Sequence, residues 1–195
     1  VRPLTGALGC EIFGVDLAHL DDASFARIHD AFLEYQAIMF HDQEITQEQF
    51  AAFGRRFGKL EDEPFLPNRT ETPGVYFFRG APSNAKSLST QKLGWHADHT
   101  YQRNPSFGAM LYAVDVPEAG GDTLFASNYL SYEGLSPALQ NFLEDKIAIH
   151  DVLQYGLDSG HNSIATTESI ERLAKMRSKG PPGELPPISP RRASG

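Results

Sequence analysis

The stretch Trp95-His96-Ala97-Asp98-His99 decides how this 195-residue sequence is interpreted. On a β-strand, side chains two positions apart point to the same face, so a strand here would aim the His96 imidazole and the Asp98 carboxylate at one point. These are two of the three ligands of the 2-His-1-carboxylate triad, which holds Fe(II) and leaves coordination positions open. His99 would point the other way. The pattern H-x-D recurs by chance, so taken alone it favours a surface or hydrogen-bonded histidine.

A second constellation, Gly120-Gly121-Asp122-Thr123, follows later in the chain. The two glycines permit a tight turn and a close approach of the backbone to another group. Thr123 offers a hydroxyl that could bind an anionic ligand near a metal ion. Taken alone, this pattern favours an ordinary turn with a threonine on the following strand.

Capping residues and hydrophobic spacing predict a mixture of helices and short strands. Asp21 and Asp22 are good N-caps for a helix that runs to about residue 35. Thr46 with Gln49 has the form of a capping box, before a helix that Gly58 stops. The other predicted elements are strands at 9–16, 37–40, 75–78, 107–114, 122–126 and 147–149, and helices at 137–145 and 166–179. This order indicates a mixed α+β fold with a mainly antiparallel β core.

Composition and charge narrow the function classes. The length predicts one domain. A formal net charge of −8 and a pI near 5.3 argue against nucleic acid as a partner, because such binding depends on neutralising phosphates. A single cysteine, Cys10, excludes an internal disulfide and fits a reducing compartment. Because no apolar run approaches the roughly 20 residues that span a bilayer, we expect no membrane partner and a cytoplasmic protein.

Several segments, taken in order, resemble the taurine / 2,4-dichlorophenoxyacetate dioxygenase family, and the resemblance covers most of the chain. They are L-G-C-E-I-F-G-V-D-L at 8–17, A-I-M-F-H-D-Q at 37–43, F-A-A-F-G-R-R-F-G at 50–58, W-H-A-D-H-T-Y at 95–101, P-E-A-G-G-D-T-L-F-A-S at 117–127 and Y-E-G-L-S at 132–136. Motifs in this order are far more specific than H-x-D alone.

The resemblance implies a fold, a reaction and site residues. The fold would be a mixed α+β double-stranded β-helix (jelly roll) with N-terminal helices. His96 and Asp98 would be ligands of Fe(II), and Thr123 would contact a carboxylate of 2-oxoglutarate. Such enzymes couple the decarboxylation of 2-oxoglutarate by O2, to succinate and CO2, to hydroxylation of a small substrate. Here we expect an anionic substrate such as a sulfonate, sulfate ester or carboxylate. Homo-oligomers are common in the family.

Two functional residues of the family have no matching position. The family carries a distal histidine, the third iron ligand, followed by an arginine that binds 2-oxoglutarate. The tail at 186–192 resembles a degraded version of that segment and lacks its histidines. We therefore expect residues 1–180 to be a partial catalytic domain whose barrel lacks its C-terminal strands, 181–195 to be a poorly ordered Pro-rich tail, and the chain alone to have weak or no activity.

Other candidate residues are less informative. His150 is expected to be structural, and His161 to be a loop residue. Lys92 and residues 65–69 fall where family members build substrate contacts, so Lys92 is a weak candidate for binding an anionic group.

Two further hypotheses about the function stay open. One is a catalytically inactive remnant. The other is a zinc- or manganese-binding cupin-like module that uses His96, Asp98 and His99.

Overall fold

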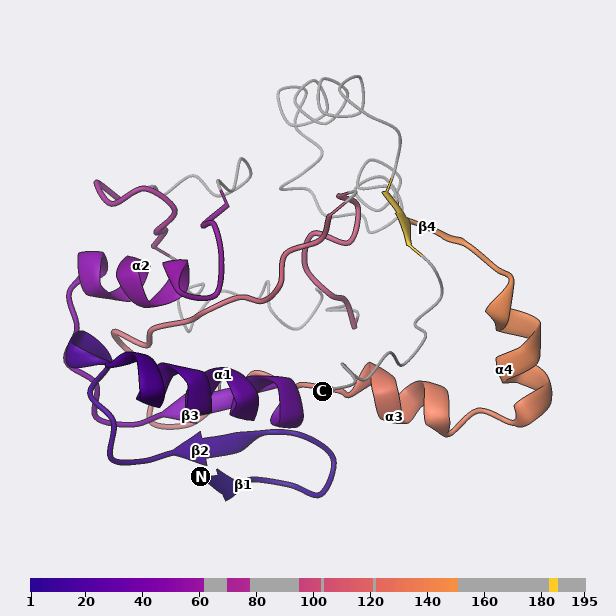
Figure 1. Ribbon diagram of the computed structural model, residues 1–195, viewed down its shortest axis with the longest axis horizontal. Helices are drawn as coiled ribbons and strands as arrows, with labels where there is room; N and C mark the ends of the chain where they lie inside the picture. Colours follow the sequence, from indigo (N-terminus) through magenta and orange to yellow (C-terminus); the bar gives the residue numbers. More distant parts are fainter. Residues whose placement is uncertain (62–69, 78–94, 103, 121, 151–182, 186–195) are drawn as a thin grey trace.

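Helices and short strands form two groups, one at each end of the chain (Figure 1). The computed structural model describes residues 1–61, 70–77, 95–102, 104–120, 122–150 and 183–185. The elements are β1 (Arg2–Pro3), β2 (Cys10–Ile12), the 3-10 helix η1 (Leu17–His19), α1 (Asp22–Tyr35), β3 (Ile38–Phe40), α2 (Gln47–Arg55), α3 (Asn128–Glu133), α4 (Pro137–Glu144), β4 (Ala148–His150) and β5 (Gly183–Leu185).

The N-terminal group is a three-stranded sheet covered by α1. β1 pairs antiparallel with β2, and β2 pairs parallel with β3, so α1 forms the crossover between the two parallel strands. The predicted helix cap is confirmed, because the Asp21 carboxylate accepts a hydrogen bond from the Ser24 N–H at 2.7 Å. The helix ends at Gln36, whose left-handed backbone (φ 64°) lets its N–H donate to the Phe32 carbonyl.

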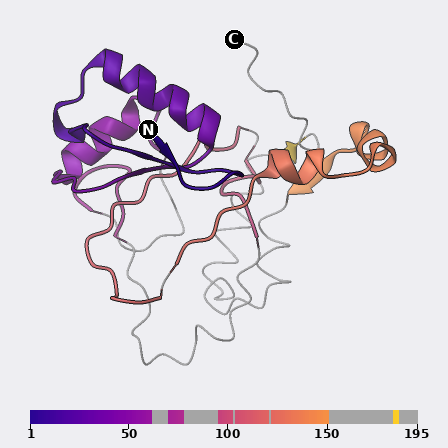
Figure 2. The same ribbon diagram turned by 90° about the horizontal axis from the view of Figure 1, so that it is seen from below.

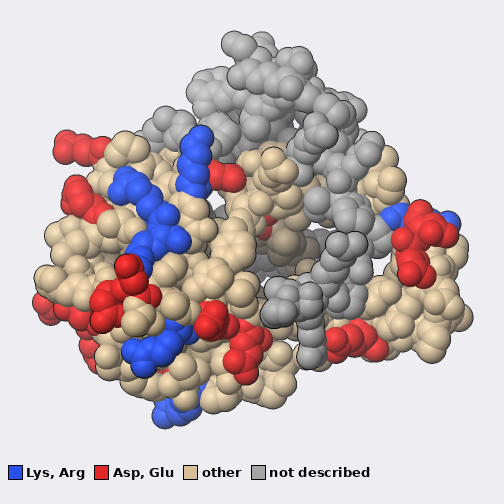
Figure 3. All heavy atoms as spheres, in the orientation of Figure 1, with Lys and Arg blue, Asp and Glu red and all other residues tan. Residues whose placement is uncertain are grey.

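The helix α2 begins at the predicted capping box and packs beside η1. The Thr46 hydroxyl accepts from the Gln49 N–H at 3.2 Å, and the Gln49 side chain accepts from the Thr46 N–H at 2.8 Å. The helix ends at Arg55, three positions before the predicted stop at Gly58. Arg56 ties α2 to α1, since its guanidinium lies 4.2 Å from the Phe25 ring centroid and pairs with Asp22. Figure 3 shows basic and acidic side chains interspersed over this part of the surface.

The buried core of the described residues lies in the N-terminal group. Its buried apolar members are Cys10, Ile12, Ile28, Ala31, Ala51 and Phe53. A set of aromatic rings surrounds them and includes His29, whose ring stacks on Phe107 at a centroid distance of 6.0 Å. Met110 also packs against this cluster. The segment that carries Phe107 and Met110 is therefore anchored on the N-terminal group, although it lies far along the sequence.

The predicted strands at 107–114 and 122–126 are wrong for this structure, since neither segment contains a strand (Figure 2). A strand exists only when a neighbouring chain completes its hydrogen-bond ladder. Residues 75–77 likewise carry only an isolated bridge at Tyr76. The strand-forming side chains are present but uncovered: Leu111 is 81% exposed, Val114 is 74% exposed and Leu124 is 73% exposed. Strand propensity in the sequence was therefore not sufficient to make these segments strands.

The C-terminal group contains α3, α4 and the two-stranded sheet β4-β5. Ser136 caps α4 and Pro137 begins it, as predicted. The short helix α3 was not predicted; Ser127 caps it and also donates to the Gln36 side chain at 2.8 Å, which ties α3 to the end of α1. The strand β4 starts one residue later than predicted and pairs antiparallel with residues 183–185, which belong to the Pro-rich tail.

The predicted helix at 166–179, and all of the tail except 183–185, lie outside the described residues. None of the helices in the described part of the chain has the length and apolar character that crossing a bilayer requires.

Glu11 is a buried carboxylate in β2 that gives the N-terminal sheet a pH dependence. Arg2 donates to it, and His41 Nε2 lies 2.8 Å from its other oxygen. The hydrogen bonds from Arg2 first, and from His41 second, hold the pKa of Glu11 below its ordinary value. The stabilisation by ionised Glu11 is therefore present above the unfolded-state pKa of about 4.3 and is lost as the pH falls through the lower folded-state value.

We expect the thermal midpoint of the chain to fall on acidification, and Glu11→Gln to lower the midpoint at neutral pH and flatten its dependence on pH. Thermal unfolding followed by circular dichroism between neutral pH and pH of about 3 measures this. Glu44→Gln removes an exposed carboxylate and serves as the matched control. Parallel curves for the unmodified chain and Glu11→Gln would contradict the expectation.

Candidate metal centre and adjoining pocket

The side chains of His96 and Asp98 face each other. His96 Nε2 lies 3.3 Å from Asp98 Oδ1, and the two side chains are 62% and 60% exposed. The strand considered for this stretch is not present, because residues 95–97 have no regular structure and lead into a turn at 98–101. The strand was the reason to expect the imidazole and the carboxylate to converge. The two groups do converge, although the strand is absent.

This pair fits as part of a divalent metal site. Two donors at about 2.1 Å from an ion, in adjacent octahedral positions, lie about 3.0 Å apart. The separation of 3.3 Å between the two side chains is close to that value. One imidazole nitrogen and one carboxylate oxygen also suit Fe(II). Within the ranges that the structure describes, no cluster of three or more His, Cys, Asp or Glu residues could hold a metal, so the pair supplies two protein ligands.

His99 is turned to other partners. Its Nδ1 lies 2.5 Å from Ser106 Oγ and 3.1 Å from Glu61 Oε2. A three-ligand cupin-like site made of His96, Asp98 and His99 is therefore not formed. The backbone of His99 is left-handed, with φ 56°, which is uncommon for a residue with a side chain. Sequence reasoning missed Glu61 and Ser106, because nothing in the local pattern links them to His99.

His150 contacts the same turn from the C-terminal group. Its Nδ1 lies 2.9 Å from the Thr100 hydroxyl, although the two residues are 50 positions apart. This hydrogen bond agrees with the structural role expected of His150. It also joins β4 to the turn at 98–101, which begins at Asp98.

The other predicted site residues are not brought to the pair by any contact in the described chain. Thr123 is exposed in the irregular segment 122–126, and no hydrogen bond between described residues involves its hydroxyl. Lys92, His161 and residues 65–69 lie outside the described residues. Their predicted roles therefore stay predictions.

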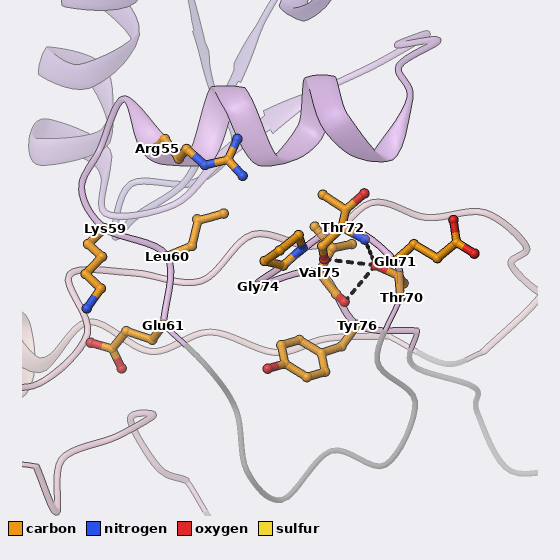
Figure 4. Close-up of a pocket in the computed structure, with 11 residues that line it drawn as sticks. Arg55, Lys59, Leu60, Glu61, Thr70, Glu71, Thr72, Gly74, Val75 and Tyr76 are labelled. Atoms are coloured by element: carbon orange, nitrogen blue, oxygen red, sulfur yellow. Dashed lines mark hydrogen bonds between the residues drawn. The ribbon is translucent and has the colours of Figure 1, made fainter.

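A pocket of about 540 Å³ lies between the C-terminal end of α2 and the turn at 70–76 (Figure 4). Gly74 shapes its rim: the φ of this residue is +80°, and a Cβ atom there would lie 2.8 Å from Leu60 Cβ. The charged side chains that line the pocket are Arg55, Lys59, Glu61 and Glu71. Two cations and two carboxylates balance, so the lining alone does not select the charge of a ligand.

Glu61 connects this pocket to the turn at 98–101, because it lines the pocket and also contacts His99. The pocket was not predicted, because its lining combines the end of α2 with the turn at 70–76 and no local motif links the two segments.

Comparison with known proteins assigns the chain to a family. The sequence model of the taurine catabolism dioxygenase TauD, TfdA family matches residues 1–188. The chain belongs to this family, as the order of its sequence motifs predicted.

Three related proteins show the extent of the similarity. An (S)-phenoxypropionate/alpha-ketoglutarate-dioxygenase of Sphingobium herbicidovorans is 34% identical over 85% of this chain and 58% of its own length. An alkylsulfatase of Acinetobacter baylyi is 32% identical over 90% of this chain and 54% of its own length. The crystal structure of a taurine dioxygenase from Burkholderia xenovorans superposes with a TM-score of 0.65 and 32% identity, over 76% of this chain and 52% of that chain. The chain thus spans somewhat more than half of these relatives.

Proposed function

We propose that this chain carries the iron-binding half of a dioxygenase site that hydroxylates a small organic substrate with consumption of 2-oxoglutarate and O2. The observation that carries the proposal is the approach of His96 Nε2 to Asp98 Oδ1 at 3.3 Å, in a chain that belongs to this family. When bound, the iron supplies O2 activation coupled to decarboxylation of 2-oxoglutarate to succinate and CO2.

Each residue of the proposed site has a defined task. His96 and Asp98 would hold Fe(II) through an imidazole nitrogen and a carboxylate oxygen. The Thr123 hydroxyl donates a hydrogen bond to a carboxylate of 2-oxoglutarate. The exposure of all three side chains supports these tasks, since a ligand can reach each of them.

The proposed substrate is a small organic anion. The names of the related proteins refer to their substrates. The Sphingobium protein is named after a phenoxypropionate, the Acinetobacter protein is called an alkylsulfatase, and a Saccharomyces cerevisiae relative is named after a sulfonate. All three names describe organic molecules that carry a negatively charged group. Within the pocket, Arg55 and Lys59 are the cations that could meet such a group.

The proposed fold around the site is the jelly roll of this family. The similarity to a solved taurine dioxygenase supports it. So do the uncovered apolar side chains of Leu111, Val114 and Phe125, because further strands of a jelly roll would cover such faces.

An assay of 2-oxoglutarate-dependent succinate formation tests the proposal. With Fe(II), ascorbate and a panel of sulfonates, sulfate esters and phenoxy acids, we expect the 195-residue chain to show weak or no turnover, because two protein ligands hold the ion less tightly than three. Any turnover that is present should disappear in Asp98→Ala. Robust turnover would contradict the expected weakness, and turnover unaffected by Asp98→Ala would contradict the proposed site.

A further inference from the structure

Glu61 is the centre of a hydrogen-bond cluster beside the metal-binding pair. Its Oε2 accepts from Ser106 Oγ at 3.1 Å and from Gln102 Nε2 at 3.2 Å, and it lies 3.1 Å from His99 Nδ1. The His99 side chain is only 19% exposed. Glu61 is separated from these partners by about 40 positions in the sequence, so its carboxylate joins the end of the α2 region to the turn at 98–101.

The directions of these hydrogen bonds are mutually consistent. Ser106 donates its hydroxyl proton to Glu61, so its oxygen is left to accept from His99. His99 must then carry a proton on Nδ1, the nitrogen that faces Ser106. A closed set of donors and acceptors of this kind holds the imidazole in one orientation.

His99 needs such support because of its backbone. With φ 56°, it occupies a conformation that is sparsely populated by residues with a side chain and persists only when surrounding contacts hold it. Asp98 is the preceding residue and lies in the same turn at 98–101, so contacts that hold His99 also hold the turn in which the Asp98 carboxylate faces His96.

We propose that Glu61 is a positioning residue for the metal-binding pair: through Ser106 and His99 it fixes the turn at 98–101 and so keeps the Asp98 carboxylate opposed to His96. This inference rests on the proposed function, since it assumes that the pair binds the metal. Residues that orient the metal ligands without binding the metal themselves commonly raise metal affinity by about 10-fold to 100-fold.

The chain contains a built-in reporter for testing this. Trp95 is the one tryptophan of the sequence, precedes His96 and is 72% exposed. Titration with Co(II), which quenches indole fluorescence at short range, should give saturable quenching in the unmodified chain. Glu61→Ala should weaken the apparent Co(II) affinity about 10-fold and alter the visible spectrum of bound Co(II). Glu61→Gln should retain most of the affinity, because its amide oxygen still accepts from Ser106.

Control variants separate the outcomes. Glu44→Gln removes an exposed carboxylate outside the cluster and should leave the titration unchanged. Circular dichroism verifies that each variant is folded. If Glu61→Ala fails to fold, Ser106→Ala serves in its place as a smaller perturbation, and it should also weaken Co(II) binding.

The two proposals fail in different ways. If Asp98→Ala abolishes quenching while folded Glu61→Ala and Ser106→Ala bind as the unmodified chain does, the positioning role is wrong and the metal site stands. If Asp98→Ala leaves the titration unchanged, or the unmodified chain shows no saturable quenching up to millimolar Co(II), the metal site itself is wrong.

Discussion

Replacing Asp98 or His96 by alanine is expected to weaken divalent metal binding by at least about 100-fold, more than the loss of an outer partner costs. The reason is that the described part of the chain offers two protein donors at this point, 3.3 Å apart, and each variant removes one of them. A single remaining side chain cannot close a chelate around the ion. Equilibrium dialysis with Mn(II), a redox-stable substitute for Fe(II), measures the affinity directly.

His19→Ala is the matched control for this experiment. His19 is an exposed histidine that pairs with Asp16 at 2.9 Å and lies in η1, outside the proposed site. Its loss should leave Mn(II) affinity unchanged. Equal affinities for the unmodified chain and the Asp98→Ala variant would show that the ion binds elsewhere or not at all.

Phe53→Ala is expected to lower the free energy of unfolding by about 3–5 kcal/mol, the range for a buried phenylalanine. Phe53 is 7% exposed, and its ring meets Phe40 and Phe57 edge-on at 5.9 Å and 5.3 Å between centroids. The truncation removes apolar contact area and leaves a cavity among rings that cannot fully close it.

Urea unfolding followed by circular dichroism measures this loss. The control is Phe142→Ala, since Phe142 is 62% exposed and, among the described residues, its one ring contact is with the Lys146 ammonium group, at 4.9 Å. We expect that substitution to cost less than about 1 kcal/mol. A loss for Phe53→Ala no larger than that of the control would mean that the aromatic cluster does not stabilise the fold.

Three of the described helices, α1, α2 and α4, were predictable because their signals are local. Asp21, Thr46 and Ser136 each cap the helix that follows, and each makes its capping hydrogen bond within three residues of itself. The end of α2 was less predictable, since Arg56 is drawn into contact with Leu20 and Asp22, which the local sequence does not reveal. The strands were the least accurate of the predictions. A segment such as 107–114 forms a strand only when a second strand pairs with it, and local sequence does not show where that second strand lies.

The candidate site shows the same division. His96 and Asp98 converge as expected, but the strand on which the expectation depended is absent: His96 lies in an irregular segment and Asp98 begins a turn. The contacts of His99 with Glu61 and Ser106 and of Thr100 with His150 join distant parts of the chain, so no pattern within one segment predicts them. Family membership was predictable because it depends on the order of several motifs rather than on any one contact.

The placement of the core has a consequence for biosynthesis. The buried apolar residues of the described chain run from Cys10 to Phe53, so the segment that contains them leaves the ribosome well before His96 is added. Domains generally begin to fold from the N-terminus during synthesis. The parallel pair β2-β3 and its crossover helix can therefore form a nascent folding nucleus, and Phe107 and Met110 dock onto a surface that is already assembled when they emerge.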